Sequence, residues 1–125
     1  FNYIYKAIKN KKFFFVNGKN HKTPDGTTVR DYVDIDILSK FIFSLIKKSK
    51  KDTKKIFNVG SGVGISILDI LNYLNSNNLK IKYAFRDKKK GDIPFSISNN
   101  SLMLKQLKIK DKDLRILNNL KKFFK

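Results

Sequence analysis

One segment, IFNVGSGVGISILDIL at residues 56–71, constrains the fold more than any other part of the chain. An apolar run leads into three glycines spaced by single residues, and a helical pattern follows. The run predicts a buried strand at Ile56–Val59, and the glycines predict a turn at Gly60–Gly64. Ser66 and Asp69 have the spacing of a capping box, so a helix is expected to begin at Ser66. The segment therefore predicts a strand, a turn and a helix in direct succession.

Hydrophobic periodicity places further elements on both sides of this segment. Apolar residues at helical spacing predict helices at residues 1–12, 36–48, 66–75, 101–107 and 112–124. Compact or alternating apolar runs predict extended segments at residues 13–16, 29–35 and 80–86. Turn-forming and charged residues predict loops at residues 17–18, 21–28, 47–55 and 88–94. We therefore expect a mixed α/β fold (an α+β arrangement) with short strands and about five helices.

The glycine turn invites comparison with a dinucleotide-binding loop. That loop needs GxGxxG between a strand and a helix, with an acidic residue about 20 positions later to bind the ribose. Here the pattern is GxGxG, with Ile65 where the third glycine would stand and Lys80-Ile81-Lys82 where the acid is expected. The sequence therefore favours a bend that glycine permits at the end of a strand over a cofactor loop.

Composition bounds the remaining possibilities. The length of 125 residues fits one domain or a large piece of one, and a hydrophobic content of 41% is too high for a disordered tail. The absence of cysteine excludes a disulfide framework, and the single His21 excludes a histidine cluster. No apolar run approaches the roughly 18 residues of a membrane span. Because the first residue is Phe1 rather than Met, we expect that the chain begins inside a longer protein.

The formal net charge of +18 has two interpretations. Among 28 basic residues only Arg30, Arg86 and Arg115 are arginine, whereas phosphate and base recognition favour the bidentate guanidinium. The chain is also rich in Ile, Asn and Phe, which share A/T-rich codons with Lys, so the charge follows from background composition. The alternative is a functional basic surface, as in a small nucleic-acid-binding module that uses lysines and aromatic residues.

Three stretches in fixed order resemble one family. They are TPDGTTVRDYVDID at residues 23–36, IFNVGSGVGISILDI at residues 56–70 and KKKGDIP at residues 88–94. Together they resemble the C-terminal part of UDP-glucose 4-epimerases, which belong to the extended short-chain dehydrogenase/reductase superfamily of nucleotide-sugar epimerases and dehydratases. The tail from Ser101 is similar to the last two helices of that family. The resemblance covers most of the chain from about Asn17 onward.

The resemblance implies a binding site for a UDP-sugar. Arg30 matches the family arginine that contacts the diphosphate, and Tyr32 matches a tyrosine near the same end of the substrate. Lys89 falls where the family usually has a second phosphate-binding arginine, so looser diphosphate binding is expected. Asp92 matches the acid that binds the ribose hydroxyls. If the resemblance holds, Arg30 and Asp92 must lie around one shared crevice.

Other implied positions show departures from the family. Asn17 lies on the strand that meets the uracil through its backbone, at a position where the family commonly has an aromatic residue. Ile67 matches an apolar residue that lines the nucleotide pocket, and it reads equally well as core. Ser96 replaces a tyrosine that often closes this pocket, and Asp34 stands where the family commonly has histidine. These substitutions indicate a diverged member or a changed sugar preference, and another nucleotide-sugar epimerase or dehydratase of the superfamily stays an alternative.

The family chemistry needs parts that this sequence lacks. An N-terminal Rossmann half holds NAD, and a Tyr-x-x-x-Lys pair supplies the base. Only Tyr5 and Lys9 have that spacing here, in a segment where the family places no catalytic residues. We therefore expect a fragment that neither epimerises nor binds NAD alone, with exposed apolar residues at 13–15 and 56–59 where the missing half docks. The resemblance also implies a cytoplasmic homodimer for the whole protein.

Overall fold

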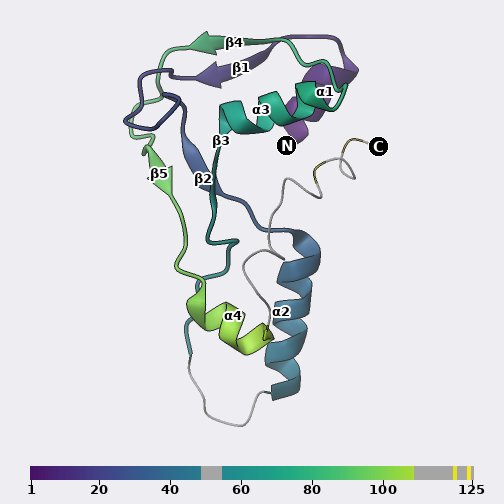
Figure 1. The fold of residues 1–125 in the computed structure, drawn as a ribbon, viewed down its shortest axis with the longest axis vertical. Helices are drawn as coiled ribbons and strands as arrows, with labels where there is room; N and C mark the ends of the chain where they lie inside the picture. Colours follow the sequence, from purple (N-terminus) through teal and green to yellow (C-terminus); the bar gives the residue numbers. More distant parts are fainter. Residues whose placement is uncertain (49–54, 109–119, 121–123, 125) are drawn as a thin grey trace.

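The computed structural model describes residues 1–48, 55–108, 120 and 124. In this part of the chain, helices and short strands alternate in a mixed α/β fold (Figure 1). The elements in order are α1 (Asn2–Lys9), β1 (Phe14–Asn17), β2 (Val29–Asp31), α2 (Ile35–Lys48), β3 (Gly64–Ser66), α3 (Ile67–Ser76), β4 (Tyr83–Arg86), β5 (Phe95–Ser96) and α4 (Ser101–Leu107).

One end of the molecule, which we call the sheet lobe, consists of α1, β1, α3 and β4 (Figure 1). Strands β1 and β4 pair in parallel, with Phe14 opposite Tyr83 and Asn17 opposite Arg86. The lobe encloses the larger hydrophobic core, in which Ile70, Leu71 and Leu74 of α3 are fully buried. Helix α3 presents these residues at helical spacing, which is why one face of it is apolar.

Both ends of α3 are fixed by side chains. At its N-terminus the Ser66 hydroxyl accepts a hydrogen bond from the backbone N–H of Asp69 (2.9 Å), and the Asp69 carboxylate accepts one from the N–H of Ser66 (3.0 Å). This capping box confirms the predicted start of the helix. Near its other end Asn75 accepts a hydrogen bond from the N–H of Ile81 (2.8 Å), which ties α3 to the segment leading into β4.

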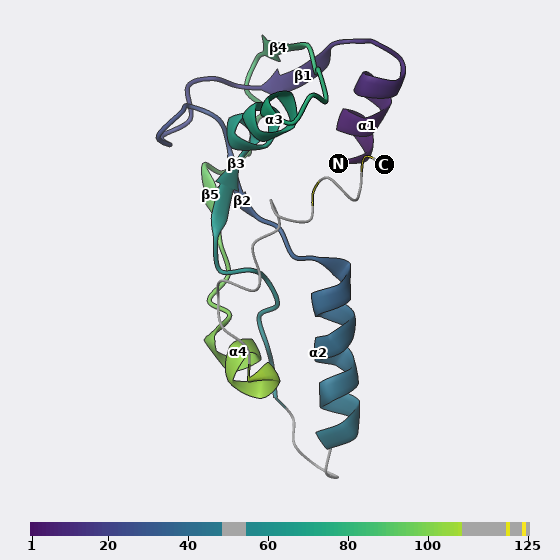
Figure 2. The same ribbon diagram turned by 45° about the vertical axis from the view of Figure 1, so that its right-hand side comes forward.

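The other end of the molecule, the helix lobe, consists of α2 and α4 (Figure 2). Its core is small: Phe41 of α2 and Met103 of α4 are buried, with half-buried apolar side chains around them. The Phe41 ring meets Phe57 edge to face at a centroid distance of 5.2 Å. Between the lobes lies a three-stranded sheet in the order β3-β2-β5, which we call the connecting sheet. Strand β2 is antiparallel to β3 and parallel to β5.

The predicted helices at residues 1–12, 36–48, 66–75 and 101–107 are present as α1 to α4, with α1 shorter than expected. The predicted extended segments contain β1, β2 and β4. The predicted helix at 112–124 lies outside the described residues except for residues 120 and 124, as does most of the predicted loop at 47–55. No helix in the described ranges has the length and apolar character needed to cross a membrane.

The predicted strand at Ile56–Val59 is wrong. This segment is irregular, and Ile56 is 91% exposed, while Phe57 and Val59 pack against the core of the helix lobe. The strand lies later, at β3, so the predicted turn ends at Val63 instead of Gly64. The expected exposure of apolar residues holds for Phe13, Phe15 and Ile56, whereas Phe14 is half buried against the sheet-lobe core.

Candidate functional site

Arg30 and Asp92 meet although 62 positions separate them in the sequence. Arg30 lies on β2, and Asp92 lies in the loop that leads into β5. The guanidinium donates through Nη2 to Asp92 Oδ1 at 2.5 Å and through Nη1 to the carbonyl oxygen of Ile93 at 2.8 Å. Each side chain of the pair is 26% exposed, so the pair remains accessible to a ligand. The two side chains therefore meet, whereas a crevice shared by both stays a prediction, because the pocket of about 370 Å³ that Arg30 lines does not include Asp92.

Asp31, the next residue on β2, accepts hydrogen bonds from two other segments. Its Oδ1 accepts from the backbone N–H (2.7 Å) and the hydroxyl (2.6 Å) of Ser61. Its Oδ2 accepts from the N–H (3.1 Å) and the hydroxyl (2.5 Å) of Ser98, and from the N–H of Gly62 (3.1 Å). We call this arrangement of Asp31, Ser61, Gly62 and Ser98 the aspartate clasp. It joins β2, the glycine turn and the segment after β5.

The clasp gives the glycine turn a structural role. A Cβ atom on Gly60 would lie 2.2 Å from Ser98 Oγ and 2.4 Å from Asp31 Oδ2, so only glycine lets the backbone approach them so closely. Gly62 has a φ of +73°, a conformation that side chains disfavour. The N–H groups of Ser61 and Gly62, which a phosphate-binding turn would direct at its ligand, are donated to Asp31 instead. The geometry supports the interpretation of this turn as a bend.

The electrostatics of the clasp follow from its hydrogen bonds. Partial burial raises the pKa of Asp31, but the hydrogen bonds from Ser61 and Ser98 outweigh burial, so the pKa lies below its ordinary value of 3.8. Burial raises the pKa of the Tyr32 hydroxyl, and the neighbouring Arg30 charge lowers it in part. Asp31 is therefore a carboxylate and Tyr32 a neutral phenol near neutral pH.

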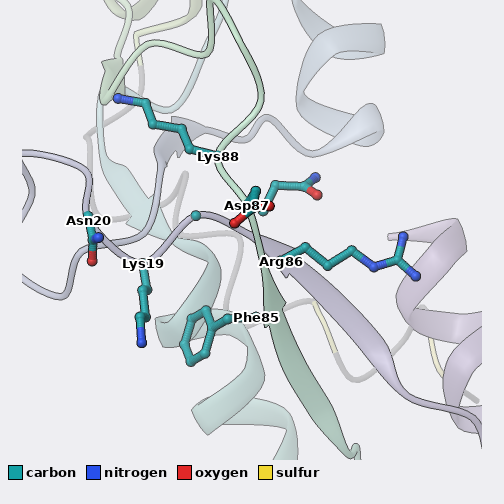
Figure 3. Close-up of a pocket in the computed structure, with 8 residues that line it drawn as sticks. Lys19, Asn20, Phe85, Arg86, Asp87 and Lys88 are labelled. Atoms are coloured by element: carbon teal, nitrogen blue, oxygen red, sulfur yellow. The ribbon is translucent and has the colours of Figure 1, made fainter.

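An open pocket of about 730 Å³ lies at the ends of β1 and β4 (Figure 3). It is lined by Asn17, Gly18, Lys19, Asn20, Phe85, Arg86, Asp87 and Lys88. Figure 3 shows Lys19 and Lys88 on one side of the pocket and Arg86 extending to the other. The Arg86 guanidinium also lies over the Phe15 ring, 3.6 Å from its centroid. Positive charge therefore surrounds a pocket that an anionic ligand of nucleotide size could enter.

The other predicted site residues occupy different environments. Asn17 lines the pocket, and Lys89 is exposed in the loop next to Lys88, with its carbonyl accepting the N–H of Asp92 at 3.2 Å. Tyr32 and Ile67 are half buried against the core of the sheet lobe. The Tyr32 ring packs against Phe1 at a centroid distance of 5.1 Å. The structure thus brings Arg30 and Asp92 into contact, and packs Tyr32 and Ile67 against the core of the sheet lobe.

The sequence analysis missed the aspartate clasp and most of the pocket lining. Asp31 stands beside Arg30 in the motif, and the sequence alone assigns it no role in the site. Ser61 and Ser98 gave no signal, because single serines in loops are common and nothing local links them to β2. Within the described residues, no group of three histidine, cysteine or acidic side chains is placed to hold a metal ion.

Comparison with known proteins identifies the relatives of the chain. No family model matches it. It is 33% identical to the UDP-glucose 4-epimerase of Bos taurus over 103 residues, which are 81% of this chain and 30% of that protein. The UDP-glucose 4-epimerase of Dictyostelium discoideum is 33% identical over 104 residues, with the same shares. The chain thus spans 30% of the length of these curated relatives.

The fold leads to the same proteins. The crystal structure of UDP-glucose 4-epimerase from Bifidobacterium longum, in complex with NAD+ and UDP, superposes with a TM-score of 0.76 at 30% identity. The match covers 90% of this chain and 35% of that chain. These matches do not favour the alternative of a nucleic-acid-binding module. In sequence and in fold, the chain is thus similar to the C-terminal region of UDP-glucose 4-epimerases.

Proposed function

We propose that residues 1–125 are the UDP-sugar-binding region of a UDP-glucose 4-epimerase-like enzyme that interconverts UDP-glucose and UDP-galactose. The observation that carries the proposal is the contact between Arg30 and Asp92. By the resemblance, Arg30 matches the family arginine that contacts the diphosphate, and Asp92 matches the acid that binds the ribose. The 33% identity to curated UDP-glucose 4-epimerases supports the substrate class.

The chemistry of these side chains suits the two parts of the substrate. The guanidinium of Arg30 is a planar donor that matches phosphate oxygens. Asp92 uses Oδ1 for Arg30, and within the described residues its Oδ2 accepts no hydrogen bond, which leaves that atom for a ribose hydroxyl. The exposed Lys89 adds positive charge next to the diphosphate. In this proposal Asn17 holds the uridine end beside the pocket at the end of β1, and Tyr32 and Ile67 support the site from the core.

The reaction itself requires a part outside this chain. We propose an N-terminal Rossmann half that binds NAD and covers the exposed side chains of Phe13, Phe15 and Ile56. Transient oxidation and reduction at C4 of the sugar is the chemistry that NAD would supply when held by that half. The share of this chain is to hold the UDP so that C4 points at the other half. The whole protein is proposed to form a homodimer, as the resemblance implies.

Calorimetric titration of the chain with UDP tests the proposal. We expect saturable binding that Arg30→Ala weakens by at least tenfold, since a hydrogen bond to a charged group is worth about 1.5–3 kcal/mol. Arg30→Lys should fall between the two, because it keeps the charge and loses the fork. Lys6→Ala, on the exposed side of α1, is the matched loss of a charge elsewhere and should leave UDP binding unchanged.

A second variant tests the position of Lys89. Lys89→Arg should tighten UDP binding if this residue contacts the diphosphate, whereas Lys90→Arg should have a smaller effect. Absence of saturable UDP binding by the wild-type chain would contradict the proposal. Turnover of UDP-galactose by the chain alone would show that it is not a part of a larger active site. Turnover after co-expression with the first two-thirds of a relative would support the proposed partner.

A further inference from the structure

The loop that carries Asp92 is exposed and leads into a very short strand. Lys88, Lys89 and Lys90 are exposed, and the following strand β5 has only two residues, which pair with β2 at Val29 and Arg30. Near Asp92 the loop is attached to β2, because Arg30 donates to the Ile93 carbonyl oxygen and the Val29 N–H donates to that of Pro94 at 2.8 Å. A second attachment beyond β5 would restrict the motion of Asp92 further.

The aspartate clasp supplies that attachment. Ser98 lies six positions after Asp92, and both its N–H and its hydroxyl bind Asp31 Oδ2. The segment between Asp92 and Ser98 is thus held at both ends by consecutive residues of one strand. Arg30 holds the first end and Asp31 holds the second. Because neighbouring side chains on a strand project to opposite faces, the two attachments do not compete for space.

The third component of the clasp makes it stiff. Ser61 and Gly62 approach the same carboxylate from the glycine turn, and a Cβ on Gly60 would collide with Asp31 Oδ2 and Ser98 Oγ. Ser61 is 1% exposed, so its hydrogen bond to Asp31 is shielded from water. A carboxylate that accepts from three residues in two separate segments fixes those segments relative to β2. An amide at position 31 would turn one oxygen into a donor that faces other donors.

We propose that Asp31 is a positioning residue of the UDP-sugar site, which holds Asp92 and Arg30 in register for the ligand by clamping Ser98 and the glycine turn to β2. The inference rests on the proposed function, because it concerns the same site. Asp31 touches no ligand in this proposal. It acts through the segment from Asp92 to Ser98, and its loss lowers ligand affinity before it unfolds the protein.

The test compares two carboxylate-to-amide substitutions. Asp31→Asn disrupts the clasp. Asp69→Asn removes the carboxylate of the α3 capping box, which likewise accepts a hydrogen bond from the backbone N–H of a serine, Ser66. At a temperature where circular dichroism shows both variants folded, Asp31→Asn should weaken UDP binding by on the order of tenfold, since small misplacements of binding groups have effects of this size or larger. Asp69→Asn should leave the affinity within about twofold, because the Asp69 carboxylate bonds Ser66 and does not hold the segment from Asp92 to Ser98.

Two further measurements separate positioning from a purely structural role. Ser98→Ala should weaken UDP binding less than Asp31→Asn, and combining the two should add little, because they break one interaction. Amide hydrogen exchange in Asp31→Asn should accelerate at residues 61–62 and 95–98 while the core amides of α3 keep their protection. UDP affinity that is unchanged in folded Asp31→Asn, or faster exchange spread evenly over the molecule, would overturn the inference.

The outcomes for the two proposals are distinguishable. If the wild-type chain does not bind UDP, the proposed function fails, and the role of Asp31 is then read from the exchange pattern and from the NMR signal of the Arg30 guanidinium. A changed Arg30 signal in Asp31→Asn would preserve the mechanical link from Asp31 to Asp92. If the signal and the exchange pattern stay as in the wild type, the positioning role fails as well.

Discussion

The sheet lobe and the helix lobe use similar apolar residues but bury them to different extents. In the sheet lobe, Ile70, Leu71 and Leu74 are fully buried on one face of α3. In the helix lobe, α2 buries Phe41, while Phe43 and Ile46 on the same helix are 64% and 67% exposed. The difference teaches that the sheet lobe closes its own core, whereas the helix lobe leaves large apolar side chains of α2 exposed to solvent.

The largest expected effect on stability comes from a substitution in the core of the sheet lobe. Leu74→Ala should lower the free energy of unfolding by about 3 kcal/mol, because it removes buried methyl groups and leaves a cavity. Denaturant unfolding followed by circular dichroism measures this change. Leu102→Ala, at a 59% exposed position of α4, is the control and should change it by less than about 0.5 kcal/mol. Equal effects of the two substitutions would refute the assignment of the core.

The same change in the helix lobe should cost less. Met103 is also fully buried, but its core contains fewer residues, so Met103→Ala should lower the free energy of unfolding by about 2 kcal/mol. Hydrogen exchange should show faster opening of α2 and α4 alone, since the lobes have separate cores. If α1 and α3 lose protection to the same extent, the two lobes form one cooperative unit and the comparison fails.

Acidic pH should destabilise the protein mainly where the two lobes join. The pKa of Asp25 and that of Asp31 lie below 3.8, because hydrogen bonds from Ser66 to Asp25 and from Ser61 to Asp31 outweigh partial burial. A depressed folded-state pKa contributes stability that is fully present above the unfolded value and is lost as pH falls through the folded value. The free energy of unfolding, measured from neutral pH down to about pH 2, should therefore decrease once the pH drops below the ordinary aspartate pKa.

The variant Asp31→Asn should flatten that acidic decline while lowering stability at neutral pH. The effect should be smaller than that of either core substitution, because Asp31 is only partly buried. Asp36→Asn, at an exposed position in the first turn of α2, is the matched control and should keep the wild-type decline. A wild-type acid profile in Asp31→Asn would show that the clasp does not contribute to the pH dependence.

The smallest effect on stability concerns the exposed face of α2. Phe43→Ser should change the free energy of unfolding by less than about 0.5 kcal/mol, because removing this exposed ring breaks few packing contacts. It should also reduce self-association, which light scattering at increasing concentration would measure. Phe41→Ser, two positions earlier and 2% exposed, should unfold the helix lobe. A large loss of stability in Phe43→Ser would show that this face is already covered.

The sequence predicted those elements whose pattern is local. The spacing of Leu38, Phe41, Leu45 and their neighbours indicated α2, and the capping box at Ser66 placed the start of α3. The predicted strand at Ile56–Val59 failed because apolar, β-favouring residues form a strand only where a partner strand is available. The partner, β2, pairs instead with Gly64–Ser66, whose glycine disfavours a strand on local grounds.

The candidate site also has a part that the sequence predicted and a part that it did not. The contact between Arg30 and Asp92 could be predicted because a family resemblance connected two distant motifs. The aspartate clasp could not, since the partners of Asp31 lie 30 and 67 positions away and have no pattern of their own. The pocket at the end of β1 was out of reach for the same reason, because it depends on the register of β1 against β4.

Gly60 extends this point to substitutions that leave every charge in place. Since a methyl group there would collide with both Asp31 and Ser98, an alanine would have to push the serine away from the carboxylate. The added methyl group would then break the contact between Ser98 and Asp31 by steric collision, as loss of the Asp31 carboxylate would. The requirement for a negative charge at position 31 and the requirement for an empty volume at position 60 are thus a single constraint, shared by two residues that a substitution table would score separately.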